Sequence, residues 1–132
     1  MSNQTLDLHP HTVAQAIEGM ALSFNPKKAK DLDATIQFHI DGEGGDDWFL
    51  IITDGQCHCE NGVTANPTLT INTPADVWLK IARDEMNGAM ALMTGKYRAS
   101  GKIALLLKMD KIFSRQPSEA ELAEKGWLEK RQ

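Results

Sequence analysis

The chain of 132 residues has few cysteines and no long apolar run. No stretch approaches the roughly 18 apolar residues that a membrane-spanning helix needs, and the first residues, MSNQTLDLHPH, lack the basic and apolar regions of a secretion signal. The two cysteines, Cys57 and Cys59, lie too close together on one expected strand to form an ordinary disulfide. These absences predict a cytoplasmic protein in a reducing compartment.

Positive charge is also scarce. The formal net charge is -4, with 14 Lys and Arg against 18 Asp and Glu, and the two signs alternate along the chain. Because nucleic-acid binding requires Lys and Arg clustered on one face, we expect no nucleic-acid partner. The length suits one domain with its own core. We assign residues 1–115 to that domain and residues 116–132 to a C-terminal tail with a short helix, which Ser118 and Glu121 would start as a capping box.

Sequence signatures of catalysis and metal binding are missing as well. The chain has no GxSxG, Walker, GxGxxG or HExxH motif. In Cys57-His58-Cys59 the alternation of a strand turns His58 away from both thiols, and no second ligand pair follows. The acidic loop DGEGGDD lacks the ligand order of an EF-hand and is typical of a solvated hairpin. We therefore expect no enzymatic activity, no metal and no cofactor.

The hydrophobic pattern changes period several times along the chain. Apolar spacings of three and four predict a helix between His11 and Phe24, with Thr12 as its N-cap. ATIQFHI, WFLIIT, QCHCE and TLTINT predict four strands in meander order. Thr73 is expected to cap a helix that Pro74 begins, and a short helix (AMALM), a fifth strand (KYRAS) and a final helix (KIALLLKMDKIFSR) follow. This order predicts an α+β fold, a five-stranded mainly antiparallel sheet covered on one face by helices.

Methionine is concentrated in the second half of the chain. Met86, Met90 and Met93 are spaced by four and three residues, as on one helical face, and Met109 joins them from the final helix. Methionine is unbranched and polarisable, so it suits both a core and a wall that adapts to an apolar guest. The final helix also carries more apolar residues than one stripe requires. The residues alone leave core packing and a ligand cavity both open.

Several segments between about His11 and Arg115 together resemble the sterol carrier protein 2 domain, also called the non-specific lipid-transfer protein domain. They are, in order, PKKAKDLDATIQFHIDG, WFLIITDGQ, LTINTPADVWLKIARDEMN and ALMTGKYRASGKIALLLKM. The last is similar to the family's succession of a methionine-containing short helix, a Gly-Lys step, a short strand, a glycine and a final apolar helix. Lys102 departs from the pattern, because many members have an acidic residue after that glycine.

The resemblance implies an apolar tunnel between the helices and the sheet. Such a tunnel accepts lipids such as a sterol, a fatty acid, an acyl-CoA or an isoprenoid, with no bond made or broken. Lys96 and Arg98 are expected near its mouth, where they would meet a lipid headgroup, and Gly95 would let the backbone turn tightly. The implied ligand-binding residues are Trp78, Ile81, Met86, Met90, Met93, Leu106, Leu107 and Met109.

Three function classes follow from these observations. The leading one is a lipid carrier, whose work would include transient contact with a membrane surface. The alternative is an accessory factor that presents a hydrophobic intermediate, such as a quinone precursor, to a partner enzyme docked on the C-terminal tail. An enzyme is the weakest reading, because no nucleophile, base and metal set is evident. The sequence leaves the oligomeric state and the identity of the lipid open.

Overall fold

The computed structural model describes residues 10–115, which form six short helices and one sheet. The C-terminal helix and capping box that the sequence predicts lie outside the described residues. In chain order the elements are α1 (Val13–Leu22), α2 (Pro26–Ala29), β1 (Ala34–Asp41), β2 (Asp47–Thr53), β3 (Gln56–Asn61), β4 (Leu69–Pro74), α3 (Ala75–Ala82), α4 (Gly88–Met93), β5 (Arg98–Gly101), α5 (Ile103–Leu107) and α6 (Met109–Ile112).

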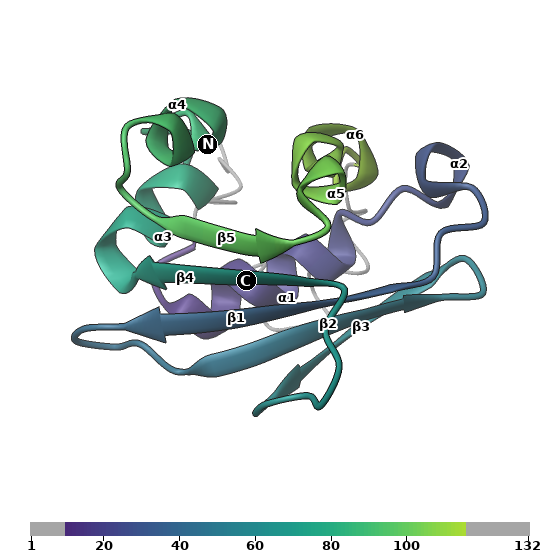
Figure 1. Ribbon diagram of the computed structural model, residues 1–132, viewed down its shortest axis with the longest axis horizontal. Helices are drawn as coiled ribbons and strands as arrows, with labels where there is room; N and C mark the ends of the chain where they lie inside the picture. The colour runs from purple at the N-terminus through teal and green to yellow at the C-terminus, as the bar shows by residue number, and fades with distance from the viewer. Residues whose placement is uncertain (1–9, 116–132) are drawn as a thin grey trace, which may run out of the picture.

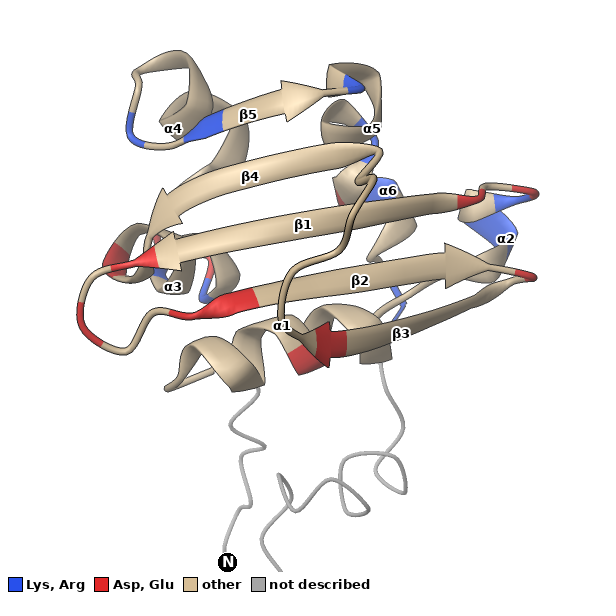
Figure 2. Cartoon of the chain, turned by 60° about the horizontal axis from the view of Figure 1, so that its bottom comes forward, with Lys and Arg blue, Asp and Glu red and all other residues tan. Residues whose placement is uncertain are grey.

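The five strands form one sheet in the order β3-β2-β1-β4-β5. All neighbours are antiparallel except β1 and β4, which run parallel. The helices lie on one face of this sheet (Figures 1 and 2), so the predicted α+β class and the mainly antiparallel sheet are confirmed. The predicted meander is wrong, because β4 pairs with β1 and not with β3. The connection from β3 to β4, residues 62–68, makes this possible by crossing the face opposite the helices (Figure 2).

The core lies between the sheet and the helices. Strand register aligns Phe38 of β1 with Trp48 of β2 and with Ile71 of β4, so these side chains share the helix-covered face. Phe38 and Ile71 are fully buried, as is Ile17 of α1, which packs from the helical layer. The alternation seen in the sequence therefore marks the core face correctly in these strands.

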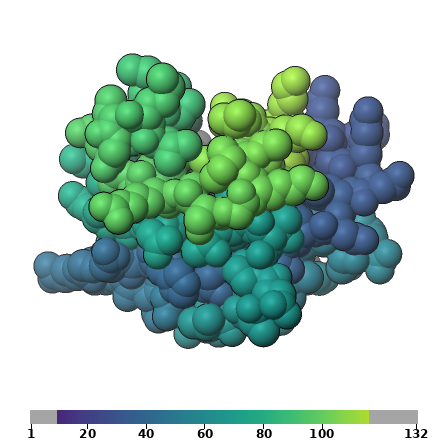
Figure 3. Space-filling view, viewed as in Figure 1, coloured from purple at the N-terminus to yellow at the C-terminus, as the bar shows by residue number. Residues whose placement is uncertain are grey.

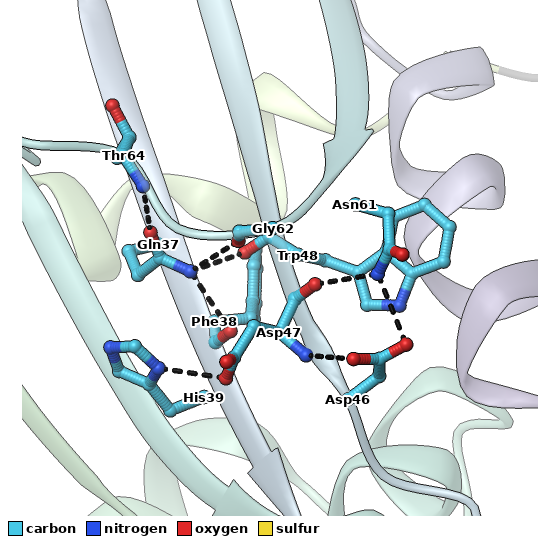
Figure 4. Close-up of polar contacts among 9 residues, drawn as sticks. All are labelled: Gln37, Phe38, His39, Asp46, Asp47, Trp48, Asn61, Gly62 and Thr64. Atoms are coloured by element: carbon cyan, nitrogen blue, oxygen red, sulfur yellow. Dashed lines mark hydrogen bonds and ion pairs between the residues drawn. The ribbon is translucent and has the colours of Figure 1, made fainter.

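One polar residue on the opposite face is buried. The sequence places Gln37 with the exposed residues of its strand, yet its side chain is 1% exposed. Its Nε2 donates to the carbonyl oxygens of Phe38, Trp48 and Gly62 at 3.2, 3.0 and 3.1 Å, and its Oε1 accepts from the backbone N–H of Thr64 at 2.8 Å (Figure 4). Gln37 thus fastens the β3–β4 connection to the sheet.

Replacing Gln37 with leucine is expected to lower the free energy of unfolding by about 2 kcal/mol. Leucine fills a similar space but leaves the Thr64 N–H and the Gly62 carbonyl without their partner, and an unsatisfied buried polar group costs roughly 1–3 kcal/mol. Urea denaturation followed by circular dichroism measures the change. Gln56→Leu, at an exposed position of β3, is the matched control, and an equal loss in both variants would contradict the assignment.

Some helix boundaries also differ from the sequence prediction. Thr12 caps α1 as predicted, accepting from the Gln15 N–H at 3.1 Å. Thr73 does not cap α3, because it still belongs to β4, and Pro74 occupies the N-cap position without a side-chain hydrogen bond. The final helix is broken at Lys108 into α5 and α6. The basic segment after Asn25 forms the single turn of α2.

Gly101 is required where β5 leads into α5. Its φ is +97°, a region that favours glycine, and a Cβ there would lie 2.5 Å from the carbonyl oxygen of Thr68. That same oxygen accepts a hydrogen bond from the Lys102 N–H at 2.9 Å. The close approach of the two backbones explains the second glycine of the MTGKYRASGKI segment, and it fixes where α5 starts.

The two cysteines lie on β3, the edge strand next to β2. Register aligns Cys57 with Ile52 and Cys59 with Leu50, which places both thiols on the helix-covered face and His58 on the other. Both cysteines pack against the core, and His58 points away from them as the alternation predicts. Burial, with a smaller contribution from the neighbouring Cys59, raises the pKa of Cys57 to about 12.

Cys57 is expected to react with iodoacetamide at pH 8 at least about tenfold more slowly in the folded protein than in urea. The thiolate is the reactive form, and the folded state keeps the proton, so little thiolate exists below a pKa of about 12. The same shift means that this thiol's contribution to stability is present below pH 9 and is lost as the pH rises toward 12. Peptide mass spectrometry of the alkylated protein measures the rate, and equal rates in buffer and urea would contradict the shift.

Candidate functional site

A cavity of about 570 Å³ lies among the helices. Its walls come from α3 and the segment after it, from α4, and from α5 and α6, with Met20 of α1 completing the lining. Figure 3 shows a notch in the surface between the lobe formed by α4 and the lobe formed by α5 and α6. The segments that meet here are far apart in the sequence, and β5 joins the two lobes (Figure 1).

Trp78 of α3 joins the cavity to the core. Its indole ring packs against Phe38 at a centroid distance of 5.2 Å and meets Tyr97 edge-on at 5.9 Å. The residue is buried, and its Nε1 has no hydrogen-bond partner among the described residues. A buried indole N–H usually finds an acceptor, so this donor is notable in a residue that lines a cavity.

The α4 wall is held by short-range hydrogen bonds. Asn87 caps the helix, its Oδ1 accepting from the Met90 N–H at 2.9 Å. The hydroxyl of Tyr97 donates to the carbonyl oxygen of Gly88 at 3.1 Å, which ties the start of α4 to the segment entering β5. Ala91 is the buried residue of α4, while Leu92 lines the cavity. Only six residues long, α4 depends on these contacts for its stability.

The opposite wall is fastened to the end of α1. The Asn25 N–H donates to the carbonyl oxygen of Ile112 at 2.7 Å, and Arg115 Nη2 donates to that of Leu22 at 2.6 Å. Phe113 packs its ring against Phe24 at a centroid distance of 6.2 Å. These contacts hold α5 and α6 in place beside the cavity.

The structure brings six of the eight residues implied by the resemblance to this cavity. Two methionines of α4 lie elsewhere: Met90 and Met93 are 57% and 80% exposed and are not part of the lining. Lys96 and Arg98 are exposed and also lie outside it. The structure shows a notched pocket and not the tunnel that the resemblance implies. The six residues in the lining are Trp78, Ile81, Met86, Leu106, Leu107 and Met109.

Sequence reasoning missed several lining residues. Met20 lies at the apolar spacing of the first helix, and that spacing does not distinguish a core position from a cavity position. Tyr97 could have been found, because it is the one tyrosine of the chain and a buried tyrosine between short elements often joins them through its hydroxyl. The polar members of the lining, Asp84, Asn87 and Asp110, carried no signal, since they belong to ordinary helix ends.

The charged side chains in the cavity lining, Asp84 and Asp110, are both acidic. Burial raises the pKa of Tyr97, and the nearby Asp110 carboxylate raises it further.

Among residues 10–115 no group of three or more His, Cys, Asp and Glu side chains is placed to hold a metal ion. In the same part of the chain, no helix is long and apolar enough to cross a bilayer.

Comparison with known proteins identifies relatives of this chain. The model of the SCP-2 sterol transfer family matches residues 15–114. Hydroxysteroid dehydrogenase-like protein 2 of Mus musculus is 29% identical over 99 residues, which cover 73% of this chain but only 20% of the mouse protein. The chain therefore corresponds to about a fifth of that relative.

Two solved structures share the fold. The solution structure of palmitated SCP2L2 from Aedes aegypti is 20% identical and has a TM-score of 0.65, with 82% of this chain and 99% of that chain covered. The UbiJ-SCP2 ubiquinone synthesis protein is 15% identical, with a TM-score of 0.57, and the likeness covers 74% of this chain and 86% of that chain. At these identities the likeness is one of fold.

Proposed function

Because this chain belongs to the SCP-2 sterol transfer family, we propose that its pocket binds one apolar lipid and carries it without making or breaking a covalent bond. The observation that carries the proposal is the cavity of about 570 Å³ beside Trp78, within the roughly 300–1,000 Å³ typical of small-molecule sites. The three methionines and three leucines of its lining form an adaptable apolar wall. Each methylene buried there contributes roughly 0.8 kcal/mol, so a long chain is held without a precise polar code.

The walls of the pocket are suited to adjust around a guest. The helices α4, α5 and α6 have six, five and four residues, and helices of this length are marginal without tertiary contacts. A bound lipid supplies such contacts and converts the notch into an enclosed tunnel. Binding then stabilises the helical layer, which raises the melting temperature by ordinary linkage.

Loading and release take place at a membrane surface in this proposal. Ile103 and Leu107 of α5, and Met90 and Met93 of α4, are large apolar side chains exposed on two helices that wall the pocket, and in this proposal the pocket mouth lies between them. Residues 88–115 carry six Lys or Arg and a single Asp, although the whole chain has a net charge of -4. Exposed apolar side chains among cations match the interface of an anionic bilayer. Figure 2 shows the acidic residues concentrated at other places, including the β1–β2 hairpin and the end of β3.

The alternative is a factor that presents a hydrophobic intermediate, such as a quinone precursor, to a partner enzyme. What favours it is that the mouse relative is about five times longer than the matched region and that one fold neighbour is a ubiquinone synthesis protein. A pull-down with the full chain and with a chain ending at residue 115 tests this role. A partner enzyme lost on that deletion would support it, and an unchanged set of partners would count against docking through residues 116–132.

Gentle native mass spectrometry of the purified protein, followed by organic extraction, tests the proposed function. A stoichiometric adduct that is released as a lipid would support binding and give the chemical class of the ligand. A quinone-like adduct would favour presentation to an enzyme, and a sterol or acyl lipid would favour the carrier. A clean protein mass with no thermal shift from sterols, fatty alcohols, fatty acids, acyl-CoA or quinones would overturn the proposal.

A further inference from the structure

The charged residues in the lining of the pocket all have the same sign. They are Asp84, which follows α3, and Asp110, in the first turn of α6. Lys108 and Lys111 flank Asp110 in the sequence. All of these side chains are exposed to solvent, but only the two aspartates belong to the lining. A group that enters the pocket therefore meets two carboxylates and no cation in its walls.

Asp84 holds a position where glycine is common. Its N–H donates to the carbonyl oxygen of Ile81, and the N–H of the next residue, Glu85, donates to that of Lys80, which together make a Schellman ending of α3. Asp84 has a φ of +61°, in the left-handed region that glycine adopts most easily. Aspartate is among the few other residues tolerated there. This ending sets the carboxylate at the pocket lining.

Asp110 lies close enough to Tyr97, another residue of the lining, to affect its electrostatics. Burial raises the pKa of Tyr97, and the Asp110 carboxylate adds a smaller contribution in the same direction. A ligand carboxylate brought near Tyr97 would meet the same negative potential. Asp84 and Asp110 are themselves exposed to solvent, so water screens part of the repulsion, which acts on an end group at the open part of the pocket.

The remaining polar groups favour a hydroxyl or a carbonyl. Trp78 Nε1–H has no acceptor among the described residues, and the two aspartates can accept hydrogen bonds from a donor. A hydroxyl group both donates and accepts, so it complements this set, whereas a carboxylate only accepts and carries the wrong charge.

Resting on the proposed function, we propose that this pocket selects apolar molecules with an uncharged polar end, such as a long-chain or polycyclic alcohol, and disfavours fatty acids and other anionic amphiphiles. Asp84 and Asp110 are the residues that make this selection. The apolar walls set how tightly a chain is held, and the carboxylates set which end group is tolerated. The selection arises from the lining of this chain and not from the shared fold.

Two fluorescent probes that differ only in their end group test the selection. Pyrene-labelled dodecanol and pyrene-labelled dodecanoate are titrated into the full chain at pH 7.4, where the free carboxylate is ionised, and pyrene fluorescence gives each dissociation constant. We expect the alcohol to bind at least about tenfold more tightly. In the double variant Asp84→Asn/Asp110→Asn the carboxylate is expected to bind about tenfold better, while the alcohol changes less than about twofold.

The matched control has the same change of net charge at a distance. Glu43→Gln/Glu60→Gln, in the β1–β2 connection and on the edge strand β3, removes two exposed carboxylates that do not line the pocket, and it is expected to leave the ratio of the two constants unchanged. Equal affinities in the wild-type protein, or a ratio that the double variant leaves unchanged, would overturn the selection while leaving lipid binding intact. Binding of neither probe would overturn the proposed function, and this inference with it.

Discussion

Leu106→Glu is expected to weaken the binding of pyrene-labelled dodecanol at least about a hundredfold. Leu106 lies in the α5 wall of the pocket, partly buried and in contact with the core. Glutamate removes an apolar contact surface, and a bound chain would cover its charge, which has no cation in the lining to pair with. A hundredfold loss of affinity corresponds to roughly 2.7 kcal/mol of binding free energy. Fluorescence titration of the pyrene probe measures it.

Met90→Glu is the matched control for this experiment. Met90 is a methionine of the neighbouring wall helix, but its side chain is 57% exposed and lies outside the lining. The same charge placed there is expected to change the affinity for the soluble probe by less than about threefold. Thermal melts of both variants establish that the fold is retained. A comparable loss in both variants, or none in Leu106→Glu, would show that the ligand site is not this pocket.

The contrast between these two residues shows what the sequence could not supply. The spacing of Met86, Met90 and Met93 predicted one continuous helical face. In the structure Asn87 caps a new helix, so Met86 stands outside that helix, and α4 turns Ala91 and Leu92 inward. A cap residue and a change of helix axis are local events that the period of apolar residues does not record. The excess of apolar residues in the final helix was informative, because both of its halves, α5 and α6, contribute residues to the lining.

The sheet illustrates the same limit at longer range. The alternation of apolar residues predicted the strands and their buried face, since that pattern reflects side-chain direction within one strand. It does not specify which strand lies beside which, and so β4 was placed next to β3. The buried Gln37 depends on the true order, because two of its hydrogen-bond partners, Gly62 and Thr64, belong to the connection that this order requires. A polar residue gives no hint of such burial until its partners are known.

Met93→Glu/Ile103→Glu is expected to reduce binding to vesicles that contain phosphatidylserine about a hundredfold. Met93 is 80% exposed on α4 and Ile103 is 38% exposed on α5, and neither lines the pocket. Insertion of each side chain into the interface contributes on the order of 1.5 kcal/mol, and each new carboxylate is repelled by the anionic surface. Flotation of the protein with vesicles of phosphatidylcholine and phosphatidylserine measures the bound fraction. Binding of pyrene-labelled dodecanol in solution should be unchanged.

Val63→Glu is the control for membrane contact through α4 and α5. Val63 is 63% exposed, as large an apolar exposure as those at the pocket mouth, but it belongs to the β3–β4 connection on the opposite face of the sheet. Its vesicle binding should match that of the wild type, and wild-type binding should weaken as salt screens the six cations of residues 88–115. Equal losses in Val63→Glu would mean that contact is not made through α4 and α5. The cations of residues 88–115 and the carboxylates of the pocket lining then have separate roles. The cations bring the protein to an anionic bilayer, and the carboxylates disfavour entry of the anionic lipids of that bilayer into the pocket.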